Sequence, residues 1–309
     1  MGYQKYELSL SWLLLPAMIT LDFLIIGTQK AGTTSLYNYI DEHPQIFVPE
    51  VKEIQYFVDD RFYKQGPKYL APFFKGSEDA KARGMAYVHM LPFADCPKRV
   101  AEFNPEMKVI VMLRDPLKRA YSAYNFAAKN GWEKKGVSFL ESFDLEPVRL
   151  NGNYTERYEL GYFNNGLYHR HLSNWAKWFS KEKMLILKDS ELRHERETTL
   201  KRVFAFLGVE QEASINLKVE HNKAGGIKNP ALQKVLLDKE AGWKRKLGAV
   251  IPKPVKVALR ANVIKPVMEW NQKEEASKPI TAEEKAAIAP YFKDDLDALK
   301  RDFDINFDQ

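Results

Sequence analysis

A lysine, a glycine and three consecutive hydroxyl residues follow a short apolar segment near the start of the chain. After the apolar residues 23–26 and Gly27, the sequence continues Thr-Gln-Lys-Ala-Gly-Thr-Thr-Ser and then becomes amphipathic with a helical period. A strand, a glycine loop and a helix N-terminus bind phosphate well, because loop N–H groups and the helix dipole both favour negative charge. The stretch predicts an anion site whose residues are Lys30, Ala31, Gly32, Thr33, Thr34 and Ser35.

This loop differs from a Walker A loop, which reads G-x-x-x-x-G-K-[ST]. Gly27 and Gly32 have the required spacing, but Thr33 stands at the lysine position and the lysine is Lys30. A nucleoside triphosphate usually needs the Walker lysine and a metal ion. Lys30 alone suits a less charged nucleotide, and the alternative is a tight strand–helix turn that binds nothing.

A second strand–turn–helix unit carries an arginine and a serine. The apolar run Lys108–Leu113 predicts a buried strand, Arg114 follows it, and Asp115 and Pro116 predict the N-cap and first residue of a helix. Ligands of open parallel sheets bind beyond the carboxyl ends of the strands, so Arg114 could bind phosphate there, helped by Ser122. The alternative is that Arg114 only caps the sheet edge and Ser122 is an ordinary helix serine.

Other titratable residues are candidates for proton transfer or for nucleotide binding. Glu53 could be a general base, or it could only pair with Lys52 at the surface. His169 and His171 are rival bases, although a lone histidine on a helix is more often structural. A basic glycine-containing loop offers Lys228 as a lid over a nucleotide, with a solvated loop as the alternative.

The remaining pattern alternates strands and helices, which predicts an α/β fold with a central, mainly parallel sheet flanked by helices. A third buried strand is expected at residues 184–187, and helices at 165–179, 197–207 and 281–291. Residues 131–162 are polar and look irregular, so we expect a substrate-facing lid there. We interpret residues 1–20 as an extension and 21–309 as a single domain.

Composition narrows the range of functions. The net charge of +6 suits an anionic ligand, and the chain has neither an arginine-rich arm nor a nucleic-acid motif, so nucleic acid is not an expected partner. The apolar stretch 8–19 is too short and too interrupted for a membrane span. Cys96 is the only cysteine, which excludes an intrachain disulfide and zinc spacing, and we expect a cytoplasmic protein with an inert thiol.

Three motifs together resemble the sulfotransferases that use 3′-phosphoadenosine 5′-phosphosulfate. Residues 29–36 look like their 5′-phosphosulfate loop, residues 113–124 look like their 3′-phosphate motif with Arg114 and Ser122, and residues 52–57 resemble the catalytic-base segment of the heparan sulfate branch. The resemblance implies a P-loop-like three-layer α/β sandwich. It also implies that Glu53 is the general base, that Lys30 stabilises the leaving group, and that Lys228 approaches the nucleotide.

The implied reaction transfers a sulfuryl group to a hydroxyl or amine and leaves 3′,5′-adenosine bisphosphate, with no metal expected. The acceptor would be a glycan or a small hydroxylated molecule. Two other functions remain open on the sequence alone. One is a P-loop kinase or NTPase, in which Asp115 or Asp189 would hold magnesium, and the other is a non-catalytic nucleotide- or glycan-binding module.

Overall fold

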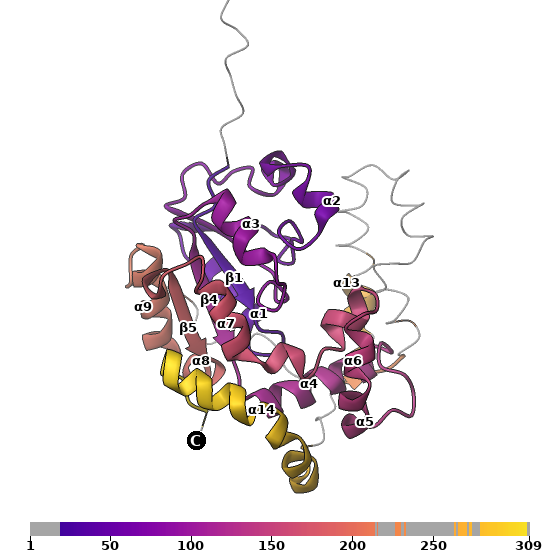
Figure 1. The fold of residues 1–309 in the computed structure, drawn as a ribbon. Helices are drawn as coiled ribbons and strands as arrows, with labels where there is room; N and C mark the ends of the chain where they lie inside the picture. The colour runs from indigo at the N-terminus through magenta and orange to yellow at the C-terminus, as the bar shows by residue number, and fades with distance from the viewer. Residues whose placement is uncertain are drawn as a thin grey trace, which may run out of the picture.

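The computed structural model describes residues 19–213 and 279–307, with short pieces between them (215, 226–229, 232, 263, 265–270 and 272–273). Its centre is a five-stranded parallel sheet with the order β2-β3-β1-β4-β5 (Figure 1). The strands are β1 (Phe23–Gly27), β2 (Ile46–Phe47), β3 (Ala82–Ala86), β4 (Lys108–Leu113) and β5 (Met184–Lys188). The predicted α/β sandwich and its three predicted strands are confirmed.

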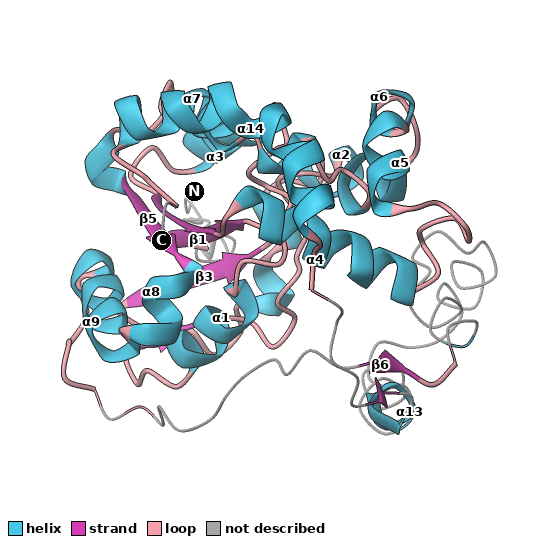
Figure 2. Cartoon of the chain, turned by 90° about the horizontal axis from the view of Figure 1, so that it is seen from below, coloured by secondary structure: helices cyan, strands magenta, loops and turns pink. Residues whose placement is uncertain are grey.

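Helices cover both faces of this sheet, which gives three layers (Figure 2). One face carries α1 (Thr33–Asp41), α8 (Asp189–His194) and α9 (Arg196–Leu207). The other carries α3 (Cys96–Phe103), α7 (Tyr168–Trp175) and the end of α14 (Ala282–Phe303). Two apolar cores result, and the central strands contribute alternate residues to each, which explains why their sequences are apolar throughout.

One close contact within the sheet depends on a glycine. A Cβ atom built on Gly84 of β3 would lie 2.2 Å from the ring of Phe23 on β1. Phe23 is fully buried, so its ring occupies the space that any larger residue at position 84 would need. This packing explains why β3 contains a glycine although glycine is a poor strand former.

The region 131–162 is less irregular than the sequence predicted. It contains α5 (Phe139–Asp144), α6 (Glu146–Arg149) and the π-helical turn η3 (Thr155–Glu159). Glu133 and Arg149 form a buried bidentate ion pair with N–O distances of 2.6 and 3.0 Å, and the Tyr162 hydroxyl donates to Glu133 at 2.9 Å. These buried bonds fix the segment, because a paired charge cannot leave its partner without a large desolvation cost.

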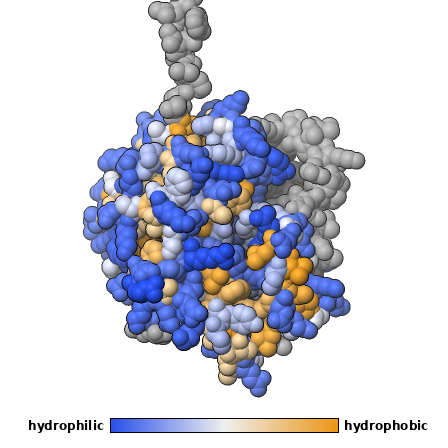
Figure 3. All heavy atoms as spheres, viewed as in Figure 1, coloured by the Kyte–Doolittle hydropathy of each residue, from blue (hydrophilic) through white to orange (hydrophobic). Residues whose placement is uncertain are grey.

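A third apolar cluster lies where this segment meets α4 (Pro116–Lys129) and α14. Phe292 of α14 packs against α5, and a Cβ on Gly166 would lie 2.6 Å from its ring. Apolar side chains also gather on the surface over α5 and α6 (Figure 3), where Leu140, Leu145, Val148 and Leu150 are exposed.

Several predicted helices have different bounds. The predicted helix 165–179 is divided into the 3₁₀ turn η4 (Asn164–Gly166) and α7, and Pro67–Phe74 forms two 3₁₀ turns, η1 (Pro67–Tyr69) and η2 (Ala71–Phe73). The helix predicted from residue 281 is confirmed as α14, which opens with a capping box of Thr281 and Glu284 and continues through Pro290 as one helix of 22 residues. The remaining elements are α2 (Asp60–Tyr63), η5 (Lys181–Lys183), β6 (Gly226–Ile227), α13 (Lys265–Trp270) and β7 (Gln272–Lys273).

None of the helices in the described residues is both long and apolar enough to cross a bilayer. The proposed extension lies almost wholly outside the described residues, which begin at residue 19.

Candidate active site

The predicted anion loop connects the carboxyl end of β1 to the first turn of α1. Its backbone turns sharply, with left-handed φ values of 68° at Lys30 and 89° at Gly32. Gly32 is the N-cap of α1 and no side chain caps the helix, so the N–H groups of Thr33 and Thr34 lack intrahelical partners. The loop therefore presents N–H donors of the kind that bind phosphate oxygens.

Hydrogen bonds join the end of β4 and Arg114 to this loop. The Thr28 N–H donates to the Met112 carbonyl at 2.7 Å, and Arg114 Nη1 donates to the Lys30 carbonyl at 3.2 Å. The two strand–turn–helix units that the sequence predicted are thus in direct contact. Arg114 Nε also lies 3.5 Å from the Asp189 carboxylate at the start of α8, and Arg193 pairs with the same carboxylate at 2.5 Å.

Lys30 is a largely buried cation among other cations. Its Nζ lies 4.3 Å from the centroid of the Phe126 ring on α4. Burial, followed by the positive charges of Arg114 and Lys129, lowers the pKa of Lys30 to about 8. A bound anion near Lys30 would stabilise its charged form strongly, because burial and the two neighbouring cations destabilise that form.

Glu53 is connected to the loop through Lys52. It forms an isolated parallel bridge with Ala86 at the carboxyl end of β3. Its Oε1 lies 2.7 Å from Lys52 Nζ, and its Oε2 accepts from the Val88 N–H at 3.3 Å. Lys52 Nζ in turn lies 3.4 Å from Thr33 Oγ1, so one ammonium connects the candidate base to the anion loop. The Lys52–Glu53 pair is therefore part of this site and not an isolated surface pair.

The other predicted site residues lie further from this group. Ser122 is half-buried in the second turn of α4, and no hydrogen bond joins it to Arg114 in the described part of the chain. Lys228 follows β6, which lies close to α13 (Figure 2). Its Nζ lies 5.0 Å from the centroid of the Trp270 ring of α13. The structure thus brings Arg114 to the loop of Lys30 and connects Glu53 to that loop through Lys52, whereas Lys228 contacts a different segment.

Both rival histidines have structural partners. His171 is buried, its Nε2 lies 2.7 Å from the Asn164 carbonyl, and burial lowers its pKa to about 4. His169 Nε2 lies 2.7 Å from the Asp302 carboxylate of α14. These contacts favour the structural interpretation of each. Cys96 is fully buried and burial raises the pKa of its thiol strongly, in line with the predicted inert role.

A buried polar group that the sequence did not predict adjoins the loop. Gln29 Nε2 donates to Glu159 of η3 at 2.7 Å, and His89 Nε2 lies 3.4 Å from the same carboxylate. His89 is 3% exposed, and its Nδ1, like Gln29 Oε1 and Thr28 Oγ1, has no hydrogen-bond partner among the described residues. These groups connect residues distant in sequence, so the loop motif alone carried no signal for them.

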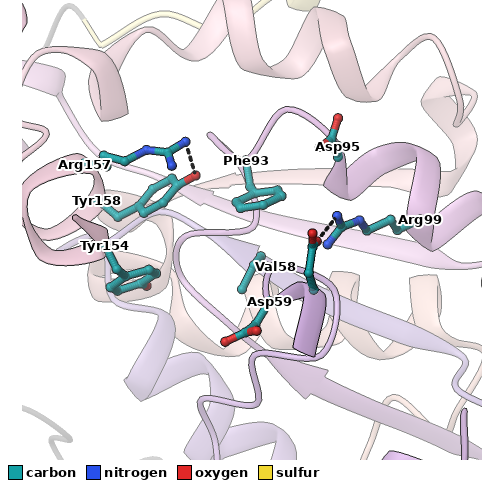
Figure 4. Close-up of a pocket in the computed structure, with 9 residues that line it drawn as sticks. Val58, Asp59, Phe93, Asp95, Arg99, Tyr154, Arg157 and Tyr158 are labelled. Carbon is teal, nitrogen blue, oxygen red and sulfur yellow. Dashed lines mark hydrogen bonds and ion pairs between the residues drawn. The ribbon is translucent and has the colours of Figure 1, made fainter. Parts of the chain in front are cut away.

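A cavity of about 400 Å³ lies between the start of α2, the start of α3 and the turn η3 (Figure 4). The residues lining it are Val58, Asp59, Asp60, Phe93, Asp95, Arg99, Tyr154, Arg157 and Tyr158. One lining residue, Tyr154, hydrogen-bonds to Tyr87, and the Tyr87 hydroxyl accepts from Gln55 Nε2 at 2.9 Å.

The aspartates that a magnesium-dependent enzyme would use have other partners. Asp115 caps α4 by accepting from the Lys118 N–H at 2.7 Å, as predicted, and Asp189 pairs with Arg114 and Arg193. Among the described residues there is no group of three or more histidine, cysteine, aspartate or glutamate side chains placed to hold a metal ion.

Comparison with known proteins agrees with this geometry. The family described as "Sulfotransferase domain" matches residues 20–247. Bifunctional heparan sulfate N-deacetylase/N-sulfotransferase 4 of Mus musculus is 29% identical over 210 residues, covering 60% of this chain and 22% of that protein. Heparan sulfate glucosamine 3-O-sulfotransferase 5 of Mus musculus is 27% identical over 192 residues, covering 60% of this chain and 53% of that protein. The chain thus matches only 22% and 53% of the lengths of these two relatives.

A solved structure is also similar. The sulfotransferase from Alicyclobacillus acidocaldarius superposes with a TM-score of 0.58 at 26% identity, covering 66% of this chain and 87% of that one.

Proposed function

The chain belongs to the sulfotransferase domain family and is an enzyme that transfers sulfate, and from this premise we propose its donor, its acceptor class and its catalytic residues. The donor is 3′-phosphoadenosine 5′-phosphosulfate, which supplies an activated sulfuryl group. The acceptor is a hydroxyl or amine of a saccharide, a class suggested by the heparan sulfate relatives. Residues that follow the carboxyl ends of β1 and β4, together with Glu53 after β2, carry the roles.

The anion loop fits the phosphosulfate end of this donor. The first-turn N–H groups of α1 can donate to phosphate oxygens. Thr28 Oγ1 and Gln29 Oε1 are buried without a hydrogen-bond partner among the described residues, as expected of polar atoms that await a ligand. Arg114 supplies a guanidinium for the other phosphate of the nucleotide, with Ser122 on the next helix as a further donor.

Lys30 stabilises the leaving group in this proposal. When the bond from sulfur to the bridging oxygen breaks, its electron pair remains on the phosphate and the negative charge there grows. A fixed, poorly solvated ammonium stabilises such charge more strongly than water does, and it acts mainly in the transition state. The low pKa of Lys30 shows how poorly the unliganded site solvates that ammonium.

Glu53 accepts the proton of the acceptor hydroxyl or amine as the acceptor atom bonds to sulfur. Lys52 and the Val88 N–H hold its two oxygens, so the carboxylate has a fixed orientation. The observation that carries the proposal is the position of Lys52 Nζ, within 3.4 Å of Thr33 Oγ1 in the loop and 2.7 Å of Glu53 Oε1. This position supports Glu53 as the base, because Lys52 connects its carboxylate to the loop that is proposed to hold the sulfuryl group.

The test replaces Glu53 by glutamine, which keeps the shape of the side chain and removes its basicity. We expect sulfate transfer to fall by about 10²-fold or more, while calorimetry shows unchanged affinity for 3′,5′-adenosine bisphosphate. Glu50→Gln, an exposed carboxylate three residues earlier, is the matched control. A wild-type chain that binds the bisphosphate but transfers no sulfate would identify a non-catalytic module, and a chain that binds no bisphosphate would refute the proposal.

A further inference from the structure

A carboxylate from a distant part of the sequence reaches the anion loop. Glu159 ends the π-helical turn η3, and its Oε2 accepts a hydrogen bond from Gln29 Nε2 at 2.7 Å. Gln29 directly precedes Lys30 in the loop. The Glu159 side chain is only 11% exposed, so water screens its charge poorly. Such a carboxylate repels an anionic donor, which makes its position beside an anion loop unexpected.

The backbone of η3 is fixed on both sides of this carboxylate. The Leu160 N–H donates to the Thr155 carbonyl at 3.1 Å, which closes the π-helical turn. The buried Asn165 donates from Nδ2 to the Tyr158 carbonyl at 2.7 Å. Turns of this kind are rare and often lie at functional sites. The direction of the Glu159 side chain is therefore set by the fold of η3.

The buried His89 contacts the same carboxylate oxygen as Gln29. Its Nε2 lies 3.4 Å from Glu159 Oε2. The residue before it, Val88, donates its N–H to the Glu53 carboxylate at 3.3 Å. Glu159 is thus held both by the anion loop and by the segment that contacts the candidate base. It cannot turn toward water without leaving two buried polar groups unpaired, which is unfavourable.

Glu159 also provides negative charge near Lys30. Groups from three elements act on this lysine: Arg114 after β4, Lys129 and the Phe126 ring on α4, and Glu159 on η3. Burial and the two cations lower the pKa of Lys30, and Glu159 raises it. Without the Glu159 charge, the ammonium would lose its proton at a lower pH.

We propose that Glu159 is a positioning residue for sulfate transfer, which supplies counter-charge to Lys30 and holds the anion loop through Gln29. The inference rests on the proposed role of Lys30 and adds a residue to it. Lys30 stabilises the leaving group only while it carries its proton. A carboxylate held at a fixed place beside the loop favours that charged form before the donor arrives, and this effect offsets the repulsion of the donor.

The test separates the charge of residue 159 from its hydrogen bonds. Glu159→Gln keeps an oxygen that can accept from Gln29 and removes the charge, whereas Glu159→Asp keeps the charge and shortens the side chain. The pH profile of kcat/KM for the donor should have an alkaline limb near pH 8, where Lys30 loses its proton. In Glu159→Gln this limb should move to lower pH by about half a unit or more, and in Glu159→Asp it should stay close to that of the wild type.

Calorimetry gives a readout that does not depend on catalysis. Binding of 3′,5′-adenosine bisphosphate should take up protons near pH 8 in the wild type, since the anion raises the pKa of Lys30 again. In Glu159→Gln the pH of greatest uptake should fall together with the kinetic limb. Glu156→Gln is the matched control, because Glu156 lies on the same turn and accepts from the Asn153 N–H at 2.9 Å. It should leave both readouts unaltered.

A purely structural role of Glu159 gives a different result. If Glu159→Gln leaves the limb and the proton uptake at the pH of the wild type, or if Glu159→Asp moves them further than Glu159→Gln does, the inference is wrong. Glu159→Ala also removes the charge and must move both readouts in the same direction, so it replaces the glutamine variant if that protein does not fold. A wild type that lacks the limb and the uptake, or a Lys30→Met protein that retains them, would instead overturn the proposed role of Lys30.

Discussion

Replacement of Lys30 by methionine should make the unliganded protein more stable and remove its activity. The ammonium of Lys30 is largely buried, lies 4.3 Å from the Phe126 ring centroid and has two cationic neighbours, Arg114 and Lys129. Methionine has a similar length and no charge. The substitution therefore removes the unfavourable desolvation and repulsion and keeps much of the packing.

The pKa of Lys30 gives the size of the effect. It falls from 10.5 to about 8, which is about 2.5 pKa units and corresponds to roughly 3 kcal/mol at about 1.4 kcal/mol per unit. Because the folded pKa is the lower one, the unfolded chain binds more protons between pH 8 and 10.5, and the free energy of unfolding rises with pH across that window. Below pH 8 the full cost of burying the charged lysine is present. The free energy of unfolding of Lys30→Met at pH 7 should therefore exceed that of the wild type by about 1–3 kcal/mol.

Urea unfolding of the wild type and of Lys30→Met at pH 7 and at pH 10 measures the difference in free energy of unfolding between the two proteins. The advantage of Lys30→Met should be large at pH 7 and should shrink at pH 10, where the wild-type lysine is mostly neutral. Lys285→Met is the control, because Lys285 is exposed on α14. This variant should show no advantage at either pH.

Ligand binding provides a second readout of the same group. An anion beside Lys30 raises its pKa again, so binding of 3′,5′-adenosine bisphosphate at pH 8 should take up as much as about half a proton. Calorimetry in two buffers with different ionisation enthalpies measures that uptake, which should vanish near pH 6.5 and in Lys30→Met. A less stable Lys30→Met protein at pH 7, or no proton uptake by the wild type at pH 8, would refute the reasoning.

Two further predictions concern other buried groups. Arg114→Lys keeps the charge but cannot form both hydrogen bonds of the guanidinium, so affinity for 3′,5′-adenosine bisphosphate should fall about 10–100-fold by calorimetry, whereas Arg193→Lys, at the same Asp189 carboxylate, should change it little. The pKa of His171 is lowered from 6.5 to about 4 by burial, so the unfolded chain binds more protons in that window and the free energy of unfolding should fall by about 3 kcal/mol as pH drops from 6.5 to 4. In urea titrations, His171→Gln should reduce the dependence of the free energy of unfolding on pH between 4 and 6.5. An unchanged dependence would mean that another group causes it.

The sequence was sufficient for those parts of the fold that depend on local signals. The strands β1, β4 and β5 were predicted because burial on both faces makes their sequences apolar. The starts of α4 and α14 were predicted because Asp115 and the Thr281–Glu284 box cap them within one turn. The limits of β3 were not predicted, since Gly84 is explained only by the Phe23 ring on the neighbouring strand.

The candidate site also has a part that the sequence could predict and a part that it could not. Lys30 and Arg114 follow predicted strands, so their positions at the carboxyl edge of the sheet could be predicted from the sequence, whereas Glu53 was a candidate through the family resemblance. The contact of Gln29 with Glu159 joins residues 130 positions apart, and no local pattern encodes it. The regular structure of residues 131–162 likewise depends on the ion pair between Glu133 and Arg149, which are 16 residues apart in the chain.

The register between β1 and β4 has a consequence for which insertions and deletions the enzyme tolerates. These strands are direct neighbours, pairing Phe23 with Lys108 and Ile25 with Ile110, and their ends carry the loop and Arg114. The spacing of the two anion sites is therefore set by sheet hydrogen bonds and not by the length of chain that connects the strands. Surface segments between them can gain or lose residues freely, whereas a slip of one residue in register would move Arg114 by about 3.3 Å and turn it to the opposite face.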